Sequence, residues 1–335
     1  MWLRTLAPTS PPSAGPGALA LRRFRRDRGA LAFAGLFAAV LVALFAAPLY
    51  ASQVAGTTPD ENHLTDQVTI DGKQTDVVSL EGIPIGPTWT PKFFVGADEN
   101  GRDLMVRVLY GGRTSLLIGA GALALTAFFA VPLALAAGYY RGRTDAVVSR
   151  LLDLVWSFPA LLVGFLFASA INLHGAQIGP FTLEAGSKLI PVTVIGLVYV
   201  PYLARPLRGQ VLALREQRFV EAARAQGMGP LRLMLTELLP HLSTTMLVLA
   251  PLMFANAVVL ESALSFLGAG VPAPEPSFGV LIAAGLGNVI LSPHLLLAPS
   301  IALVLVVLSL SGLADGLRRA LGPRGALGVD LVRGQ

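Results

Sequence analysis

The stretch EAARAQGMGPLRLMLTELLP, residues 221–240, is polar and helix-favouring, although it lies between two apolar runs. Its first half favours a helix that Gly227 ends, because glycine readily adopts the left-handed conformation that follows a helix. Pro230 suits the first turn of a second helix over 230–238, which Pro240 is expected to end. Helices of about ten residues are marginal in water, so the segment needs either a partner surface or a place on its own bundle.

The remainder of the chain has the composition of a polytopic membrane protein. Of its 335 residues, 54% are hydrophobic and 13% are charged, and soluble domains usually carry about 25% charged residues. A helix that crosses a bilayer needs about 20 mainly apolar residues. Six segments meet this criterion, and they lie at 30–51, 115–138, 146–170, 190–211, 242–262 and 293–313.

Charge in the connecting segments predicts the orientation of the chain. Basic residues collect in cytoplasmic loops, and five arginines lie within residues 22–28. The loop 52–100 holds eight acidic residues and two lysines, and is therefore expected outside. The segment 212–241 carries four arginines and is expected inside. Both termini are thus predicted to be cytoplasmic, with the chain spanning the membrane several times.

These predictions divide the chain into two tails, a first span, an external segment and a membrane core. The external segment contains short alternating pieces (QVTI, TDVVSL) that predict a small β-rich insertion over 52–95. A cleaved signal peptide is disfavoured, because the first apolar run is longer than a signal sequence requires. The expected units are a partly disordered tail (1–29), the first span (30–51), an extracytoplasmic segment ending in an amphipathic helix (52–112), a core with five spans and the 212–241 loop (113–322), and a tail (323–335).

The sequence shows none of the usual signatures of catalysis. It has no cysteine, and its four histidines are not spaced as metal ligands. Gly72-Lys73 is followed by Gln74, so the phosphate-loop pattern GxxxxGK[ST] is not met. The arginines flank apolar runs, which fits membrane orientation better than nucleic-acid binding. We therefore expect a non-enzymatic chain without catalytic, metal-binding or cofactor-binding residues.

Five segments of the chain resemble motifs of one transport family. Glu221, Ala222, Ala223, Gly227, Leu239 and Pro240 match the "EAA" loop of ABC importer permeases. The other four segments resemble motifs of the C-type permease subunits of the dipeptide/oligopeptide/nickel class, and they lie at 96–117, 150–159, 261–279 and 312–324. The chain thus resembles the inner-membrane component of a binding-protein-dependent transport system.

The resemblance implies an all-α, six-helix type I permease fold in a bacterial or archaeal plasma membrane. It implies a homologous B-type permease, two ATP-binding subunits that hold ATP and Mg, and an extracytoplasmic substrate-binding protein as partners. The EAA residues would dock on the ATP-binding subunits, and the chain would form half of a translocation path for peptides. Nickel or another small solute is the alternative cargo, and a proton-driven secondary transporter is less favoured because few acids lie in the spans.

Individual polar residues are candidates for the path or its gate. Ionisable residues within spans are functional candidates, because burying their charge is costly. Asp153 and Glu261 meet this description, and Asn256 is a polar candidate on the same span as Glu261. The alternative for Asp153 is a structural ion pair with Arg150, and the alternative for Glu261 is an exposed place in an external vestibule.

A second group of candidates precedes the second span and comprises Asp98, Arg102, Asp103 and Arg113. Asn100 and Asp103 predict a capped helix start with Asp103 at the third helical position, so 101–112 is expected to lie as an amphipathic helix on the outer interface. The group would form an outer gate or contact the binding protein, or would simply anchor the chain at the membrane surface. In the 212–241 loop, the alternative to docking is that Glu221 pairs with Arg218 or Arg224.

Overall fold

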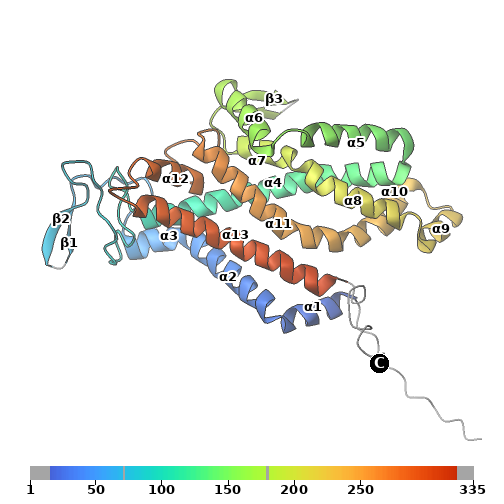
Figure 1. Cartoon of the computed structure of the whole chain (residues 1–335), viewed down its shortest axis with the longest axis horizontal. Coiled ribbons are helices and arrows are strands. Elements are labelled where there is room, and N and C mark those ends of the chain that lie inside the picture. The colour runs from blue at the N-terminus through green and yellow to red at the C-terminus, as the bar shows by residue number, and fades with distance from the viewer. Residues whose placement is uncertain (1–15, 71, 179–180, 323–335) are drawn as a thin grey trace, which may run out of the picture.

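The computed structural model describes residues 16–70, 72–178 and 181–322. These residues form a bundle of long helices with two small hairpins (Figure 1). The helices are α1 (Pro16–Arg26), α2 (Arg28–Phe45), α3 (Ala47–Leu49), α4 (Leu104–Tyr140), α5 (Gly142–Trp156), α6 (Ala160–His174), α7 (Leu189–Val198), α8 (Val200–Leu214), α9 (Arg218–Ala225), α10 (Pro230–Leu233), α11 (Leu239–Phe266), α12 (Phe278–Leu286) and α13 (His294–Leu321). Two π-helical turns are η1 (Tyr50–Ala55) and η2 (Met234–Leu238). The strands are β1 (Gln67–Ile70), β2 (Lys73–Asp76), β3 (Ala176–Ile178) and β4 (Phe181–Leu183).

The sequence predicts six membrane crossings. Among the described residues, six crossings are reached only if one bent pair of helices is taken as a single crossing. Five helical runs are long and apolar enough to cross a membrane, and they are Arg28–Phe45, Leu104–Tyr140, Leu189–Leu214, Pro230–Phe266 and His294–Leu321. The third predicted span, 146–170, is not a straight helix. It consists of α5 and α6, which meet at 85°. Pro159 explains the break, because proline disfavours helical backbone in the residue before it.

The long helix α4 is central to the bundle and packs against α7, α8 and α11. Its glycines allow this close approach. A β-carbon at Gly138 would lie 2.6 Å from the side chain of Val211 on α8, and one at Gly119 would lie 2.8 Å from Val258 on α11. Helices that touch at such positions leave little room between them. A side chain introduced there must shift the neighbouring side chain or the helix that carries it.

The predicted amphipathic helix over 101–112 is wrong, because this segment is the first part of α4. The helix begins at Leu104 and continues to Tyr140 without a break. Its start does not lie on an interface, since Val106 is fully buried. The reason is packing: Gly112 abuts Leu44 of α2 and Phe278 of α12, so this segment has protein on several sides.

The second helix of the 221–240 segment also differs from its prediction. Pro240 does not end it, because α10, η2 and α11 form one helical run over Pro230–Phe266. The backbone N–H of Leu239 donates to the carbonyl of Met234, which is the wider π-helical spacing. Pro240 then lies in the first turn of α11, where its missing N–H costs little.

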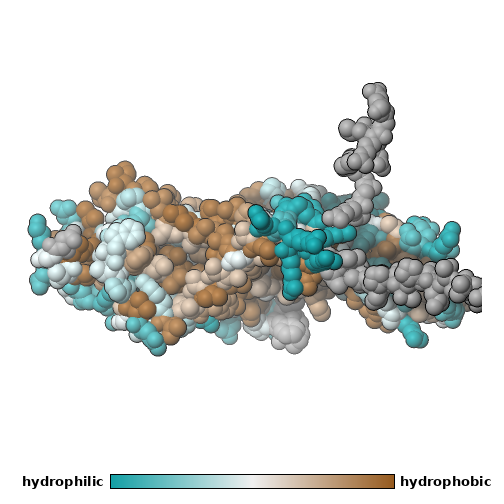
Figure 2. Space-filling view, turned by 90° about the horizontal axis from the view of Figure 1, so that it is seen from below, coloured by the Kyte–Doolittle hydropathy of each residue, from teal (hydrophilic) through white to brown (hydrophobic). Residues whose placement is uncertain are grey.

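The two ends of the bundle differ in structure and polarity. The β1–β2 hairpin lies at one end, and α9 lies at the other (Figure 1). Figure 2 shows apolar residues over the middle of one face, with hydrophilic residues at the hairpin end and around the arginine-rich α1. An ion pair between Asp27 and Arg319 (2.8 Å) joins the start of α2 to the end of α13. The first and last described helical segments therefore meet at one end of the bundle.

The segment 52–95, which the sequence predicts to be external, contains less β structure than its pattern predicts. β1 pairs with β2 in antiparallel register, from Gln67 opposite Asp76 to Ile70 opposite Lys73. The rest of the segment is irregular and covers a small apolar cluster that includes Val77, Ile85, Phe93 and Ala97. The predicted partly disordered tail falls in part on 1–15, outside the described residues, whereas Pro16–Arg26 forms α1. The predicted tail over 323–335 also lies outside them.

Candidate functional site

The loop between α8 and α11 has the helix–glycine–helix structure that its sequence predicts. α9 is followed by Gly227, which has a φ of 80°. A β-carbon at Gly227 would meet no atom within 4 Å, so backbone conformation alone requires glycine here. The next helix starts at Pro230, after Gly229 in an extended conformation.

One side of α9 packs on the protein's own bundle. Val220 is fully buried and Ala223 is 7% exposed, and both belong to the apolar cluster that contains Leu233 and Leu238. Ala223 therefore faces inward, whereas its neighbour Ala222 is exposed. One face of α9 thus packs on the bundle, as expected for an amphipathic linker. The other face of α9 is exposed.

The open face of α9 carries Glu221, whose predicted ion pairs are not found among the described residues. The ion pairs of this loop instead use Glu216, which lies 2.7 Å from Arg141. Arg224 places its guanidinium over the ring of Tyr139, 5.2 Å from the centroid. The Glu221 side chain is exposed and remains available to another molecule.

Apolar side chains extend this open surface along the following helix. Leu231 is 66% exposed and Leu235 is 51% exposed, and their spacing of four places them on one helix face. Leu239 is half-buried and Pro240 is exposed. Ala222 and Glu221 on α9 are exposed as well. We refer to Glu221, Ala222, Leu231 and Leu235 as the docking surface.

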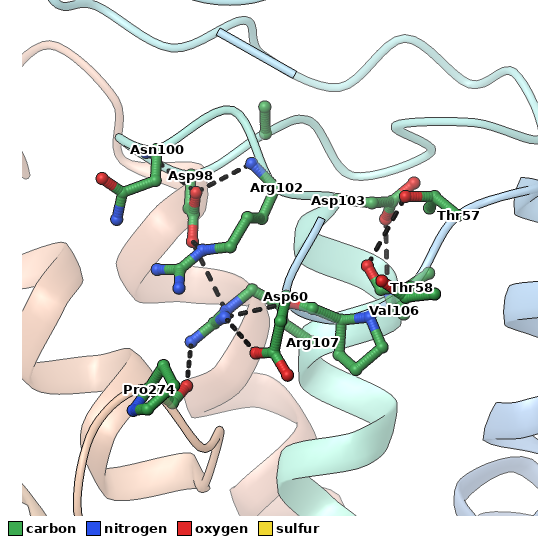
Figure 3. A network of polar contacts seen from close by, with 12 residues as sticks. Thr57, Thr58, Asp60, Asp98, Asn100, Arg102, Asp103, Val106, Arg107 and Pro274 are labelled. Atoms are coloured by element: carbon green, nitrogen blue, oxygen red, sulfur yellow. Dashed lines mark hydrogen bonds and ion pairs between the residues drawn. The ribbon is translucent and has the colours of Figure 1, made fainter. Parts of the chain in front are cut away.

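At the opposite end, Asp98 organises the turn that leads into α4 (Figure 3). Its Oδ1 accepts hydrogen bonds from the backbone N–H groups of Asn100 and Arg102, both at 2.9 Å. Its Oδ2 accepts from Nε of Arg102 at 2.8 Å. Asp98 and Arg102 thus meet as a local pair and shape the loop.

Arg107 is the residue of this network that sequence reasoning missed. Its side chain is almost fully buried, and it donates to the backbone oxygens of Pro59 (3.0 Å) and Pro274 (3.3 Å). It also forms ion pairs with Asp98 (3.4 Å) and Asp60 (3.6 Å). Figure 3 shows these contacts converging from three separate segments of the chain. An arginine at the start of an apolar helix is unusual, because a charge in or near the membrane is costly. This rule could have marked Arg107 as a candidate from the sequence.

Asp103 is the cap of α4 and not its third residue. Its carboxylate accepts hydrogen bonds from the backbone N–H groups of Phe93 (2.6 Å) and Val106 (3.1 Å). Burial raises the pKa of this carboxyl above its usual value, and the two N–H donors oppose that rise. Arg113 lies elsewhere, with its guanidinium 5.6 Å from the ring centroid of Phe45.

A cavity of about 370 Å³ lies beside this network. Asp98, Arg102 and Arg107 line it on one side, and Pro274, Leu281 and Leu295 line it on another. We call Asp98, Arg102, Asp103 and Arg107 the external network. It joins the hairpin-bearing segment, the start of α4 and the loop before α12.

Asp153 forms an ion pair, but its partner differs from the predicted one. Its carboxylate accepts a hydrogen bond from Arg205 on α8, and not from Arg150 on its own helix. Further along the same two helices, Asp145 receives two hydrogen bonds from Arg208, at 2.5 and 2.6 Å. Two interhelical ion pairs thus join α5 to α8.

Glu261 and Asn256 lie in different surroundings on α11. Glu261 is fully buried, so the alternative of an exposed vestibule position is wrong. Its carboxyl accepts a hydrogen bond from Ser265 (2.7 Å), and the hydroxyls of Ser115 and Ser277 also face it. Asn256 is exposed, and its backbone oxygen accepts a hydrogen bond from the hydroxyl of Tyr199 at 3.2 Å.

In the structure, the residues predicted for the loop contact, for the path and for the segment before α4 therefore lie at separate places along the bundle. It brings Asp98, Arg102 and Asp103 together and leaves Arg113 apart. The docking surface is at the other end (Figure 1). Within the ranges that the structure describes, no three His, Asp or Glu side chains are arranged to hold a metal ion.

Comparison with known families gives a match over residues 130–325, to the inner membrane component of binding-protein-dependent transport systems. Among individual proteins, the chain is 32% identical to the dipeptide transport system permease protein DppC of Alkalihalophilus pseudofirmus, over 96% of each chain. It is 36% identical to a putative peptide transport system permease protein of Brucella suis, over 68% of this chain and 73% of the relative. It is 28% identical to the glutathione transport system permease protein GsiD of Pectobacterium atrosepticum, over 90% and 89%.

Among solved structures, the chain resembles an inward-facing form of the MetNI methionine ABC transporter. The TM-score is 0.52 with 16% identity, and the match covers 66% of this chain and 98% of the other. At this identity the likeness concerns the fold alone, and it agrees with the type I permease fold expected from the sequence.

Proposed function

The chain belongs to the family of inner membrane components of binding-protein-dependent transport systems, and we propose that it is the permease subunit of an ATP-driven importer of short peptides. The proposal for the cargo rests on relatives named for dipeptide, peptide and glutathione transport. The observation that carries the role of the chain is the open face of α9, where an exposed acid and an exposed alanine lie on a helix whose other face is fixed to the bundle.

The docking surface is the proposed contact with the ATP-binding subunits. A short helix that is held on one side and open on the other can seat in a groove of a second protein. Glu221 would supply a charge there, and Leu231 and Leu235 would supply apolar area. ATP and Mg would be held by these partners, and the chain itself would hydrolyse no ATP.

Movement at this surface would reach the spans through covalent and packed connections. α10, η2 and α11 form one helical run from the loop into the bundle. Arg215 donates to the backbone oxygen of Tyr139 at 2.5 Å, which also joins the loop to the end of α4. Coupling requires that the ATP-binding subunits contact this surface differently in two states of the cycle. The bundle would then alternate between inward-facing and outward-facing forms.

The remaining partners follow from the same proposal. A related B-type permease would form the other half of the path, and a substrate-binding protein would approach the end that carries the external network. α9 and the helical termini at Asp27 and Arg319 would then be cytoplasmic, in a bacterial or archaeal plasma membrane. Asp153, Asn256 and Glu261 stay candidates for the path or for its gate, and Asp98, Arg102 and Arg113 stay candidates for the external contact.

A modified tripeptide is the second candidate cargo, because one relative is named for glutathione transport. Nickel or another small solute remains an alternative from the sequence. A proton-driven secondary transporter is not favoured, since the family consists of components of binding-protein-dependent systems.

The test is uptake by the assembled transporter in proteoliposomes. The chain is co-expressed with a B-type permease, ATP-binding subunits and a substrate-binding protein from the same organism, and uptake of radiolabelled alanyl-phenylalanine, glutathione and nickel is compared. We expect ATP-dependent uptake of the dipeptide that requires the binding protein. Uptake driven by a proton gradient without ATP, or uptake of nickel alone, would contradict the proposal.

A further inference from the structure

Charged and aromatic side chains cluster where α5 ends and α8 begins. The cluster comprises Asp153, Trp156, Tyr202 and Arg205, and we call it the mid-length cluster. Trp156 stacks on Tyr202, with ring centroids 4.1 Å apart and planes at 22°. The guanidinium of Arg205 lies over Trp156, 4.3 Å from its centroid, and donates a hydrogen bond to Asp153. The spacing of three in each pair of residues places them on one face of each helix.

These side chains face outward from the chain. The side chain of Asp153 is 64% exposed and that of Arg205 is 36% exposed. The two rings, Trp156 and Tyr202, are each about two-fifths exposed. A charged side chain that faces lipid within a membrane is costly, and such residues usually face a protein interior or a water-filled path. The charged side of the mid-length cluster therefore fits a water-filled path better than contact with lipid.

The backbone beside the cluster supports the same conclusion independently. Residues 157–159 interrupt the helix between α5 and α6, which diverge by 85°. Phe158 within the break is 57% exposed. Non-helical backbone at membrane depth occurs where it is buried in protein or lines a water-filled cavity. Figure 1 places this break near the middle of the long axis, between the β1–β2 hairpin and α9.

The ion pair of the cluster is chemically incomplete. Arg205 makes one hydrogen bond to Asp153, whereas Arg208 makes two to Asp145 with the paired geometry typical of structural contacts. Among the described residues, this leaves one carboxylate oxygen of Asp153 and further N–H groups of Arg205 without a partner. A carboxylate matches those N–H groups, and an ammonium group matches that oxygen. Trp156 and Tyr202 present ring faces that suit an apolar or aromatic side chain.

We propose that the mid-length cluster is a peptide contact on the translocation path. Arg205 binds the free carboxylate of the passing peptide, Asp153 binds its free ammonium group, and the stacked rings contact its side chains. The inference rests on the proposed function, because the occupant is the transported peptide. It adds a site inside the membrane that recognises the two charges common to all unmodified peptides.

The test measures uptake of radiolabelled alanyl-phenylalanine by the complete transporter, over a range of binding-protein concentrations up to saturation. Arg205→Gln and Asp153→Asn are each expected to lower the maximal uptake per ATP hydrolysed about tenfold, as the loss of one charged contact does. The concentration of loaded binding protein that gives half-maximal uptake stays unchanged. The double variant is expected to be at least as low as either single variant, because the peptide has lost both contacts.

Asp145 and Arg208 give the matched control. A structural pair suffers most when one partner is left alone, and recovers when both are neutral. Asp145→Asn with Arg208→Gln should therefore recover activity relative to either single change. As a second readout, a photoreactive benzoylphenylalanine at Tyr202 should cross-link to the labelled peptide in the wild-type complex, and the same residue at the exposed Phe128 of α4 should not.

Several results would overturn this inference. Unchanged uptake in both single variants, or full recovery in the double variant, would show that Asp153 and Arg205 form only a structural pair. Loss of the partner permease from the purified variant complexes would show a subunit contact. If the wild type takes up peptide and one of these results is found, this inference is wrong but the proposed function is not affected. If the wild type takes up no peptide, both the inference and the proposed function are wrong.

Discussion

The guanidinium of Arg107 lies 3.4 Å from the carboxylate of Asp98, and little of either side chain is exposed. Arg107 also holds the backbone at Pro59 and at Pro274. One buried cation thus fixes three segments that are far apart in the sequence.

Replacing Arg107 with methionine should loosen the end of the bundle that carries the β1–β2 hairpin. Methionine removes one of the two arginines that pair with Asp98 and takes away the donor to the backbone oxygens of Pro59 and Pro274, at a cost of about 1–3 kcal/mol for each group left unsatisfied. We expect a lower melting temperature of the purified complex and faster protease cleavage within 52–100. Arg113→Met is the control, because Arg113 lies on the same helix and places its guanidinium over the ring of Phe45, away from this network. Equal melting temperatures for the two variants would contradict this role.

Gly227 should tolerate asparagine far better than valine. Its φ of 80° is strained for a side-chain-bearing residue, at a cost of about 1–3 kcal/mol, and asparagine enters this region more readily than a β-branched residue. We expect Gly227→Val to lower ATP-dependent uptake and Gly227→Asn to retain most of it. Gly229 provides the control, since it has a φ of −66° and open space around it. If Gly229→Ala were as harmful as Gly227→Val, backbone strain would not be the cause.

Glu221→Lys should weaken the association with the ATP-binding subunits without affecting insertion. The residue is exposed on the open face of α9, so a reversed charge alters the docking surface and leaves the bundle packing intact. The measurement is the amount of ATP-binding subunit that co-purifies, together with uptake. Gln217→Lys adds positive charge just before the same helix and should have a smaller effect. Normal assembly and uptake with Glu221→Lys would rule out the docking role.

Glu261→Gln should be tolerated better than Glu261→Leu. A glutamine keeps an acceptor for the hydroxyl of Ser265, whereas leucine leaves buried hydroxyls unpaired at about 1–3 kcal/mol each. The check is the melting temperature of the complex, with Val259→Ala as an exposed control on the same helix. A leucine variant as stable as the wild type would show that the carboxyl is not needed for packing.

Local patterns in the sequence predict those features that depend on neighbouring residues. Hydropathy locates the spans, and Gly227 marks the end of α9 because its backbone conformation is a local property. The 85° angle between α5 and α6 is different, since an apolar window reports length and not direction. Pro159 signals a break but does not determine the new path of the chain.

The missed contacts involve residues distant in the sequence. Asp153 has Arg150 one turn away, yet its partner is Arg205, 52 residues further on. Arg107 meets groups at Pro59, Asp98 and Pro274, which only the folded bundle brings together. Similarly, η2 allows the helix to continue through Pro240, and no rule about proline alone predicts that outcome.

The uninterrupted length of α4 has a mechanical consequence. At 1.5 Å per residue, its 37 residues form a rod of about 55 Å, longer than the hydrocarbon core of about 30 Å. One end of the rod carries Arg107, and the other contacts the α9 loop through Tyr139. A tilt of about 5° about one end moves the other by about 5 Å for a rod of this length. The two ends of α4 thus lie at the two surfaces where partners are proposed to bind, so one continuous helix connects these surfaces.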